Sequence, residues 1–217
     1  MTEDEWLKCE DSETMLEFIR PLAPKRKLQL FAAACFRRLS HLLPDDRQMK
    51  AVEMLEDTSA GMEMREIRSI VKGTWHAMPS SEECFGEIYK DRDKAYIIAL
   101  MLYRELASQS TAHHAAHAAR GLADGGVAER KIQSQILRCI VGPLAFRAVS
   151  IDSAWATPAI HSLAQSIDNS RDFHLLPQLG QAIQQAGCND RTILEHCNDP
   201  GLHVKGCWII DSLLMKQ

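Results

Sequence analysis

The sequence predicts an all-α protein, a single compact and irregular domain of about ten helices over residues 1–217. Apolar residues recur at the spacing of an amphipathic helix along most of the chain, and no segment shows the alternation of a strand. Cap residues stand in front of several of these apolar stretches, as expected where helices begin. With 46% hydrophobic and 25% charged residues, the chain has an ordinary globular composition and can bury a core.

Two short helices are predicted first. Residues Thr2–Glu5 have the pattern of a capping box, so a helix is expected to begin there and to carry Trp6. A second helix is predicted from Ser12, with its apolar residues between Met15 and Ile19. Pro21 then separates this helix from the next one.

The clearest amphipathic stretch runs from Pro24 to Leu43 and is predicted to form a helix. Five apolar residues share one of its faces: Leu28, Phe31, Cys35, Leu39 and Leu42. Pro44 ends this helix, and Asp45 or Asp46 is expected to cap another that runs to about Thr58.

The remaining helices are predicted from the same two signals, helical spacing and cap residues. In the middle of the chain they cover Met62–His76, Ser80–Ser108, Thr111–Leu122 and Val127–Ile140. Towards the C-terminus they begin at Pro158 and then cover Leu175–Ala186, Thr192–Cys197 and His203–Met215. The residues from Val141 to Ala156 are predicted to be an ordered loop, because Gly142 and Pro143 interrupt the helical pattern there.

Charge and apolar runs exclude several classes of protein. The net charge is −4, so the basic excess typical of nucleic-acid-binding surfaces is missing, and no nucleic-acid partner is expected. Ala95–Leu102 is too short to span a bilayer, and the acidic N-terminal residues do not form a secretory signal. The seven cysteines show no close pairing, which favours thiols, a reducing compartment and a cytoplasmic location.

A cluster of potential zinc ligands lies near the C-terminus. Its members are Cys188, His196, Cys197, His203 and Cys207. If the last helix begins at His203, then His203 and Cys207 lie one turn apart on one face, and Asp211 follows one turn later, where it could orient a ligand. The spacing matches no established zinc motif, and a core explanation fits as well, because a buried cysteine behaves as a small apolar residue.

Three other polar clusters each have an ordinary structural explanation beside a functional one. Histidines at chelating spacing on an Ala-rich helix are His113, His114 and His117. Basic residues that could meet an acidic partner, or simply flank a core helix, are Lys25, Arg26, Lys27, Arg37 and Arg38. Carboxylates suited to acid–base chemistry, or to a solvated helix start, are Glu82, Glu83, Glu87 and Asp91.

Sequence motifs of common enzymes and of nucleotide-binding proteins are missing. There is no GxSxG, no GxxxxGK[ST] and no GxGxxG after a strand. Cys139 or Cys197 could act as a thiol nucleophile, but the sequence assigns neither of them a base. No catalytic residue and no cofactor is therefore expected, with zinc at the C-terminal cluster as the alternative.

Both ends of the chain resemble a family that is abundant in planctomycete genomes. The N-terminal resemblance rests on the segments EWL (5–7), MLEFI (15–19) and RKLQLFA (26–32). The C-terminal resemblance rests on AGC (186–188), HC (196–197), HVKGCW (203–208) and Asp211. The family often has two cysteines before the arginine pair, whereas here Cys35 is followed by Phe36. No activity is established for that family, so the resemblance implies none.

Three functions follow as predictions. The first is a non-catalytic protein-interaction or regulatory protein with a protein partner, since nothing catalytic is visible in a chain with a large core. The second is a structural zinc-binding protein that uses the C-terminal cluster. The third is an enzyme of an unrecognised helical type, which a deep pocket with perturbed titratable groups would support.

Overall fold

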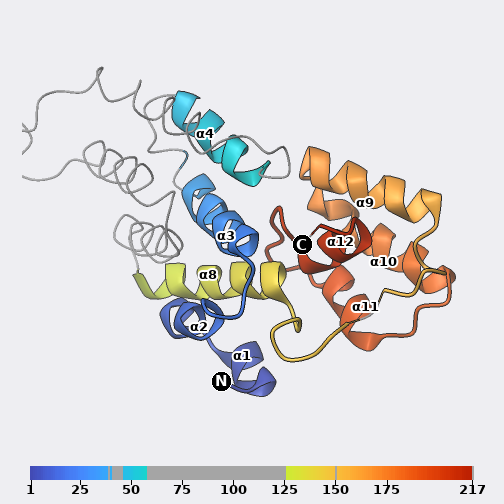
Figure 1. Cartoon of the computed structure of the whole chain (residues 1–217), viewed down its shortest axis with the longest axis horizontal. Coiled ribbons are helices and arrows are strands. Elements are labelled where there is room, and N and C mark those ends of the chain that lie inside the picture. Colours follow the sequence, from blue (N-terminus) through green and yellow to red (C-terminus); the bar gives the residue numbers. More distant parts are fainter. Residues whose placement is uncertain (39, 41–45, 58–125, 150, 217) are drawn as a thin grey trace, which may run out of the picture. The chain divides into compact units, whose positions relative to one another are not determined.

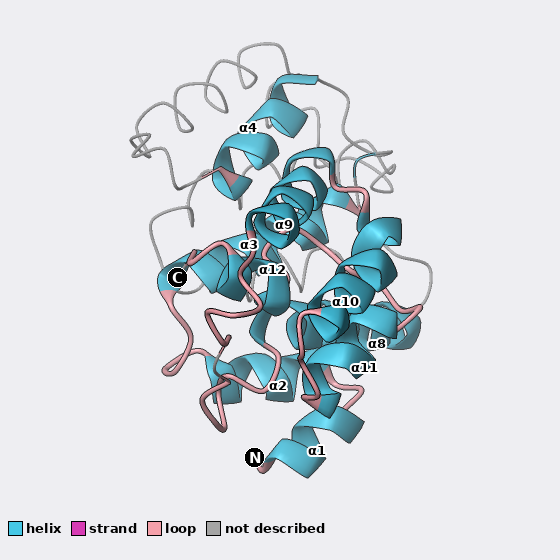
Figure 2. Ribbon diagram, turned by 90° about the vertical axis from the view of Figure 1, so that its right-hand side faces the viewer, coloured by secondary structure: helices cyan, strands magenta, loops and turns pink. Residues whose placement is uncertain are grey.

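The computed structural model describes residues 1–38, 40, 46–57, 126–149 and 151–216 (Figure 1). These residues form nine α-helices and no strand (Figure 2), so the all-α prediction is confirmed. Three predicted helices lie outside the described residues, namely 62–76, 80–108 and 111–122. Two candidate clusters also lie outside them, namely His113, His114 and His117, and Glu82, Glu83, Glu87 and Asp91. No helix among the described residues is long and apolar enough to cross a membrane.

The chain forms two compact units. Unit 1 comprises Met1–Lys8 and Gln135–Gln217, and unit 2 comprises Cys9–Ser134. The boundary between Ser134 and Gln135 falls inside one helix, α8 (Gly126–Val141). The organisation as a single domain stays a prediction.

Unit 1 is a set of short helices around an apolar core. Its elements are α1 (Glu3–Lys8), the second half of α8, α9 (Pro158–Ser170), the 3-10 helix η3 (Phe173–Leu175), α10 (Leu176–Gln185), α11 (Arg191–Asn198) and α12 (Trp208–Leu213). Fully buried aliphatic side chains from α9 to α12 fill the core, among them Ile167, Leu179, Ile183, Ile193 and Ile209. Each such side chain stabilises the fold by about 2 kcal/mol through its removal from water.

The cap signals in unit 1 form as predicted. The backbone N–H of Thr2 donates to Glu5 Oε2 at 2.8 Å, and the N–H of Glu5 donates to Thr2 Oγ1 at 3.2 Å, which completes the capping box of α1. Thr157 caps α9 with its hydroxyl oxygen, and Asp190 accepts two backbone N–H groups at the start of α11. Gly187, which ends α10, has a φ of 102°, a conformation that glycine adopts at no steric cost.

The predicted start of the last helix was wrong. Helix α12 begins at Trp208 and not at His203. A tight turn precedes it, in which the N–H of Cys207 donates to the carbonyl of Val204 at 3.1 Å and Gly206 has a φ of 89°. Because this positive φ takes the backbone out of the helical conformation, His203 and Cys207 are separated by a turn and do not share a helix face.

Unit 2 contains α2 (Ser12–Ile19), α3 (Lys25–Arg37), α4 (Asp46–Glu56) and the first half of α8. Helix α3 ends at Arg37 and not at Leu43 as predicted. Helix α3 is buried on two sides. One buried face carries Phe31 and Cys35, and the other carries Leu30 and Ala33.

Two arginines at the end of α3 pair with buried carboxylates of unit 2. Arg37 Nε and Nη2 donate to the two carboxylate oxygens of Glu56 at 2.6 and 2.7 Å. Arg38 Nε and Nη2 donate to Glu129 at 2.8 and 2.7 Å. Hydrogen bonding to Glu56 raises the pKa of Arg37, although its partial burial works in the opposite direction. Arg37 and Arg38, two of the basic residues that could have met an acidic partner, therefore stabilise the fold of unit 2.

Candidate metal centre

Four side chains with good metal-binding atoms converge in unit 1. They are Cys139, His196, His203 and Cys207, and one ligand atom from each lies within 4.8 Å of the other three. Cys207 is fully buried, Cys139 is nearly so, and both histidines are half-buried. The group could therefore hold a metal ion inside the unit.

The four residues come from three separate segments. Cys139 lies near the end of α8, and His196 lies in the last turn of α11. His203 lies in the loop after α11, and Cys207 directly precedes α12. The Asp190 cap fixes where α11 begins, so His196 is placed by a helix with a defined start.

A glycine allows α8 to approach the segment that carries Cys207. Gly142 has a φ of 58°, and a Cβ atom at this position would lie 2.5 Å from Trp208 Cδ1. Any other residue would collide with the indole ring, so only glycine fits here. Because Gly142 follows Cys139 by one helical turn and Trp208 follows Cys207 directly, this contact brings the two thiols together.

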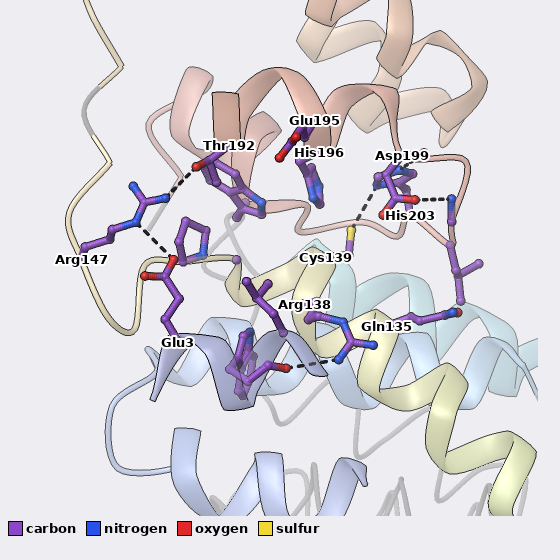
Figure 3. A pocket seen from close by; sticks show the side chains of 17 residues that line it. Glu3, Gln135, Arg138, Cys139, Arg147, Thr192, Glu195, His196, Asp199 and His203 are labelled. Atoms are coloured by element: carbon purple, nitrogen blue, oxygen red, sulfur yellow. Dashed lines mark hydrogen bonds and ion pairs between the residues drawn. The ribbon is translucent and has the colours of Figure 1, made fainter. Parts of the chain in front are cut away.

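Hydrogen bonds orient the two imidazoles differently. His203 Nε2 lies 2.9 Å from the carbonyl oxygen of Asp199, so we assign its proton to that nitrogen. Its Nδ1 then points towards Cys139 Sγ at 3.7 Å (Figure 3). Whereas His203 faces a sulfur atom with Nδ1, His196 does so with Nε2, which lies 3.2 Å from Cys207 Sγ. The rings meet edge to face, with centroids 4.9 Å apart.

The surroundings favour the thiolate form of one cysteine. Burial alone would raise the pKa of Cys207, but hydrogen bonding by Cys139 and the charge and hydrogen bonds of the two histidines hold it well below its ordinary value. For His203, burial would lower the pKa, but hydrogen bonds with Cys207 and the Asp199 carbonyl raise it above its ordinary value. Zinc binds the thiolate form of cysteine, so an environment that favours the Cys207 thiolate also favours a metal ion at this place.

Three of the five predicted ligands are brought together, and two are not. His196, His203 and Cys207 belong to the cluster, whereas Cys188 and Cys197 do not, although all three of these cysteines are buried in the apolar core of unit 1. Burial, followed by the charges of neighbouring thiols, raises the pKa of Cys197 to about 12, so this thiol stays protonated. Cys197 therefore acts as a small apolar residue that packs against Gly180 of α10.

The fourth member of the cluster, Cys139, was not among the predicted ligands. It precedes His203 by 64 positions, so no local spacing connects the two. The sequence predicted Cys139 separately, as a candidate thiol nucleophile without an assignable base. In the structure, His203 lies beside this thiol. Asp211, expected to orient a ligand, is buried, and its backbone N–H donates to the Cys207 carbonyl at 2.9 Å.

A pocket of about 570 Å³ opens onto the cluster (Figure 3). Cys139, His196 and His203 line one part of it, and the buried indoles of Trp6 and Trp208 line another. The charged groups that Figure 3 shows at the far end are already engaged, since Arg147 donates to Glu3 at 3.2 Å and to Thr192 at 2.7 Å. Small solutes can therefore reach one side of the metal-binding atoms.

The donor set and its spacing match a tetrahedral metal. Two thiolates and two imidazoles are a typical zinc set, with Zn–S near 2.3 Å and Zn–N near 2.0 Å, which places neighbouring ligand atoms about 3.3 to 3.8 Å apart. Two nitrogen–sulfur separations, of 3.2 Å and 3.7 Å, lie close to that range, and the whole group lies within 4.8 Å.

No protein-family model, no curated protein and no solved structure matches the chain.

Proposed function

We propose that the protein is a zinc-binding protein in which a structural Cys₂His₂ centre ties α8, α11 and the segment before α12 together. The observation that carries this proposal is the convergence of four soft or imidazole donors within 4.8 Å, at separations close to the edges of a zinc tetrahedron.

The proposed role is structural because four protein ligands complete a tetrahedron. A catalytic zinc keeps one position open for water or substrate, and the four donors leave none. The proposed ligands join segments that are distant in sequence, so bound metal would close a long loop of the chain in the folded state. An enzyme function is therefore not favoured by this site.

Zinc is favoured over other common ions by the chemistry of the donors. Calcium and magnesium prefer oxygen ligands, and the cluster contains only sulfur and nitrogen. The Asp199 carbonyl supports a zinc site further, because ligating histidines usually donate their second N–H to such an acceptor.

The test is a measurement of metal content on the full, untagged chain after reconstitution with a slight excess of zinc and gel filtration. We expect about one zinc per chain by elemental mass spectrometry. Cys139→Ser and Cys207→Ser should each remove most of this zinc. Cobalt substituted for zinc should give the visible absorption of a tetrahedral thiolate site in the unaltered protein.

Cys188→Ala and Cys197→Ala are the matched controls, because both cysteines are buried in the same apolar core as Cys139 and Cys207 but lie outside the group of converging ligand atoms. They should keep the metal. A chain without zinc, or a variant set in which Cys197→Ala loses the metal and Cys139→Ser retains it, would overturn the proposal. A protein partner and a cytoplasmic location stay predictions, and a pull-down that recovers a stoichiometric partner would test the first.

A further inference from the structure

Two features of the proposed zinc site make it sensitive to oxidation. Its two sulfur atoms, from Cys139 and Cys207, belong to a group whose members lie within 4.8 Å of one another. Cys139 lines the pocket of about 570 Å³, and Cys207 does not. A small oxidant can thus meet one sulfur while the second stands in position to attack it.

We propose that hydroperoxides entering this pocket oxidise Cys139 and join it to Cys207 in a disulfide, which releases the metal. This inference rests on the proposed function, because it concerns the regulation of the same site. Hydrogen peroxide is the simplest member of the oxidant class, and it is small and uncharged.

The chemistry balances in two steps. The Cys139 thiolate attacks one peroxide oxygen, the O–O bond breaks, and Cys139 becomes a sulfenic acid while hydroxide leaves and takes up a proton. The Cys207 thiolate then attacks Cys139 Sγ, the S–S bond forms, and a second hydroxide leaves as water after protonation. In sum, two thiolates, one peroxide and two protons give one disulfide and two waters.

The other cysteines of unit 1 are poor competitors. Cys188 and Cys197 are buried among aliphatic side chains and do not line the pocket. Selectivity for the cluster therefore follows from access, because Cys139 lines the pocket and is the sulfur atom that a solute in it meets first.

The disulfide would replace the metal as a cross-link. It needs the two sulfur atoms to approach to about 2 Å. Cys207 directly follows the turn at Gly206, whose φ of 89° suits glycine. After oxidation only two imidazoles would remain as ligands, too few for tight zinc binding. Unit 1 would nevertheless stay closed, because α8 would remain tied to the segment before α12.

The test treats the zinc-loaded chain with hydrogen peroxide while a chromogenic chelator reports released zinc. Peptide mass spectrometry after alkylation identifies the disulfide. We expect about one zinc released for each Cys139–Cys207 disulfide, and a thiol reductant with added zinc should restore both thiols and metal. Cys9→Ser is the matched control, because Cys9 is a partly exposed thiol of unit 2, and its loss should change neither result.

The outcomes separate this inference from the proposed function. Zinc that binds but stays bound while peroxide oxidises Cys9 would overturn the inference alone, and so would a disulfide that maps to Cys188 or Cys197. A chain that never binds zinc would overturn the proposed function and the release step together. Peroxide treatment of the metal-free wild-type chain would then still decide whether Cys139 and Cys207 pair, without relying on a variant that has to fold.

Discussion

The two units of this protein contain different clusters of polar side chains. In unit 2, the buried carboxylates of Glu56 and Glu129 each face an arginine that matches them in charge and geometry, as Glu129 faces Arg38 with two hydrogen bonds. Unit 1 also has such a pair, between Asp168 and Lys216 at 2.7 Å, but its metal-binding cluster consists of cysteines and histidines that face one another. The first arrangement neutralises itself, whereas the second gathers electron-pair donors around a common centre.

That difference separates a structural cluster from a binding site. Burying polar groups costs free energy unless they are paired, and an arginine–carboxylate pair meets this requirement within the chain. Thiolates and imidazoles that converge are best satisfied by a cation from outside it. Four experiments test this difference between the units.

The largest expected effect is the removal of zinc. At a free zinc concentration about 1,000 times its Kd, bound metal should stabilise the folded state by about 4 kcal/mol. Chelation should therefore lower the melting temperature of unit 1, which can be followed by the fluorescence of Trp6, Trp155 and Trp208. Arg37 and Arg38 variants of unit 2 should show the same chelator effect as the unaltered chain. A melting curve that does not respond to chelation would contradict a structural metal.

The next largest effect is expected for Gly142→Ala. The new methyl group would meet Trp208 at 2.5 Å and would require a left-handed backbone, which together should cost about 3 kcal/mol. Zinc affinity should fall as well, because Trp208 would be pushed away together with Cys207. Gly187→Ala is the control, since its φ is also positive but nothing lies within 4 Å. If both variants lose zinc affinity equally, the close approach is not what positions the thiols.

A smaller effect is expected for Arg38→Ala. It would leave the buried Glu129 carboxylate without its charge partner, at a cost of about 2 kcal/mol, since Arg38 is itself about one-third exposed. Arg38→Lys should recover part of the loss, because it restores the charge without the two-pronged geometry. Urea denaturation measures both variants. Their zinc content should remain that of the unaltered chain, and a loss of zinc would undermine the contrast between the units.

The smallest effect is expected at a helix cap of unit 2. Asp11 accepts a hydrogen bond from the Thr14 hydroxyl at 2.6 Å as well as backbone bonds at the start of α2, and these bonds lower its pKa. Asp11→Ala should cost about 1 kcal/mol. Because the folded pKa is lowered, the contribution is present above about pH 4 and should shrink as the pH falls through the folded value. A cost that stays constant down to pH 2 would show that the carboxylate charge is not involved.

Local signals in the sequence predicted most helix starts and part of the site. The caps at Thr2, Thr157 and Asp190 act on neighbouring residues, so a short window contains all that is needed to recognise them. His203 and Cys207 were predicted for a wrong reason, a shared helix face. They meet because Gly206 turns the backbone instead.

The rest of the site depends on packing that no short window contains. In the apolar pattern of α8, Cys139 occupies a core position. It reaches His203 only because Gly142 lets α8 approach Trp208. Conversely, Cys188 and Cys197 are closer in sequence to His196 than Cys139 is, but they do not belong to the group of converging ligand atoms. Side-chain direction in the folded unit, and not spacing along the chain, selects the ligands.

The composition of unit 1 also bears on how the chain is made. Helix α1 is synthesised before Cys9–Ser134, yet its unit also includes Gln135–Gln217, which follow that segment. The Trp6 side chain, 1% exposed in the folded protein, therefore lacks its neighbours from Gln135–Gln217 while Cys9–Ser134 is synthesised. Nascent chains halted before Gln135 should leave this indole open to chaperones, and the proposed zinc could be bound by all four ligands only after Cys207 is synthesised.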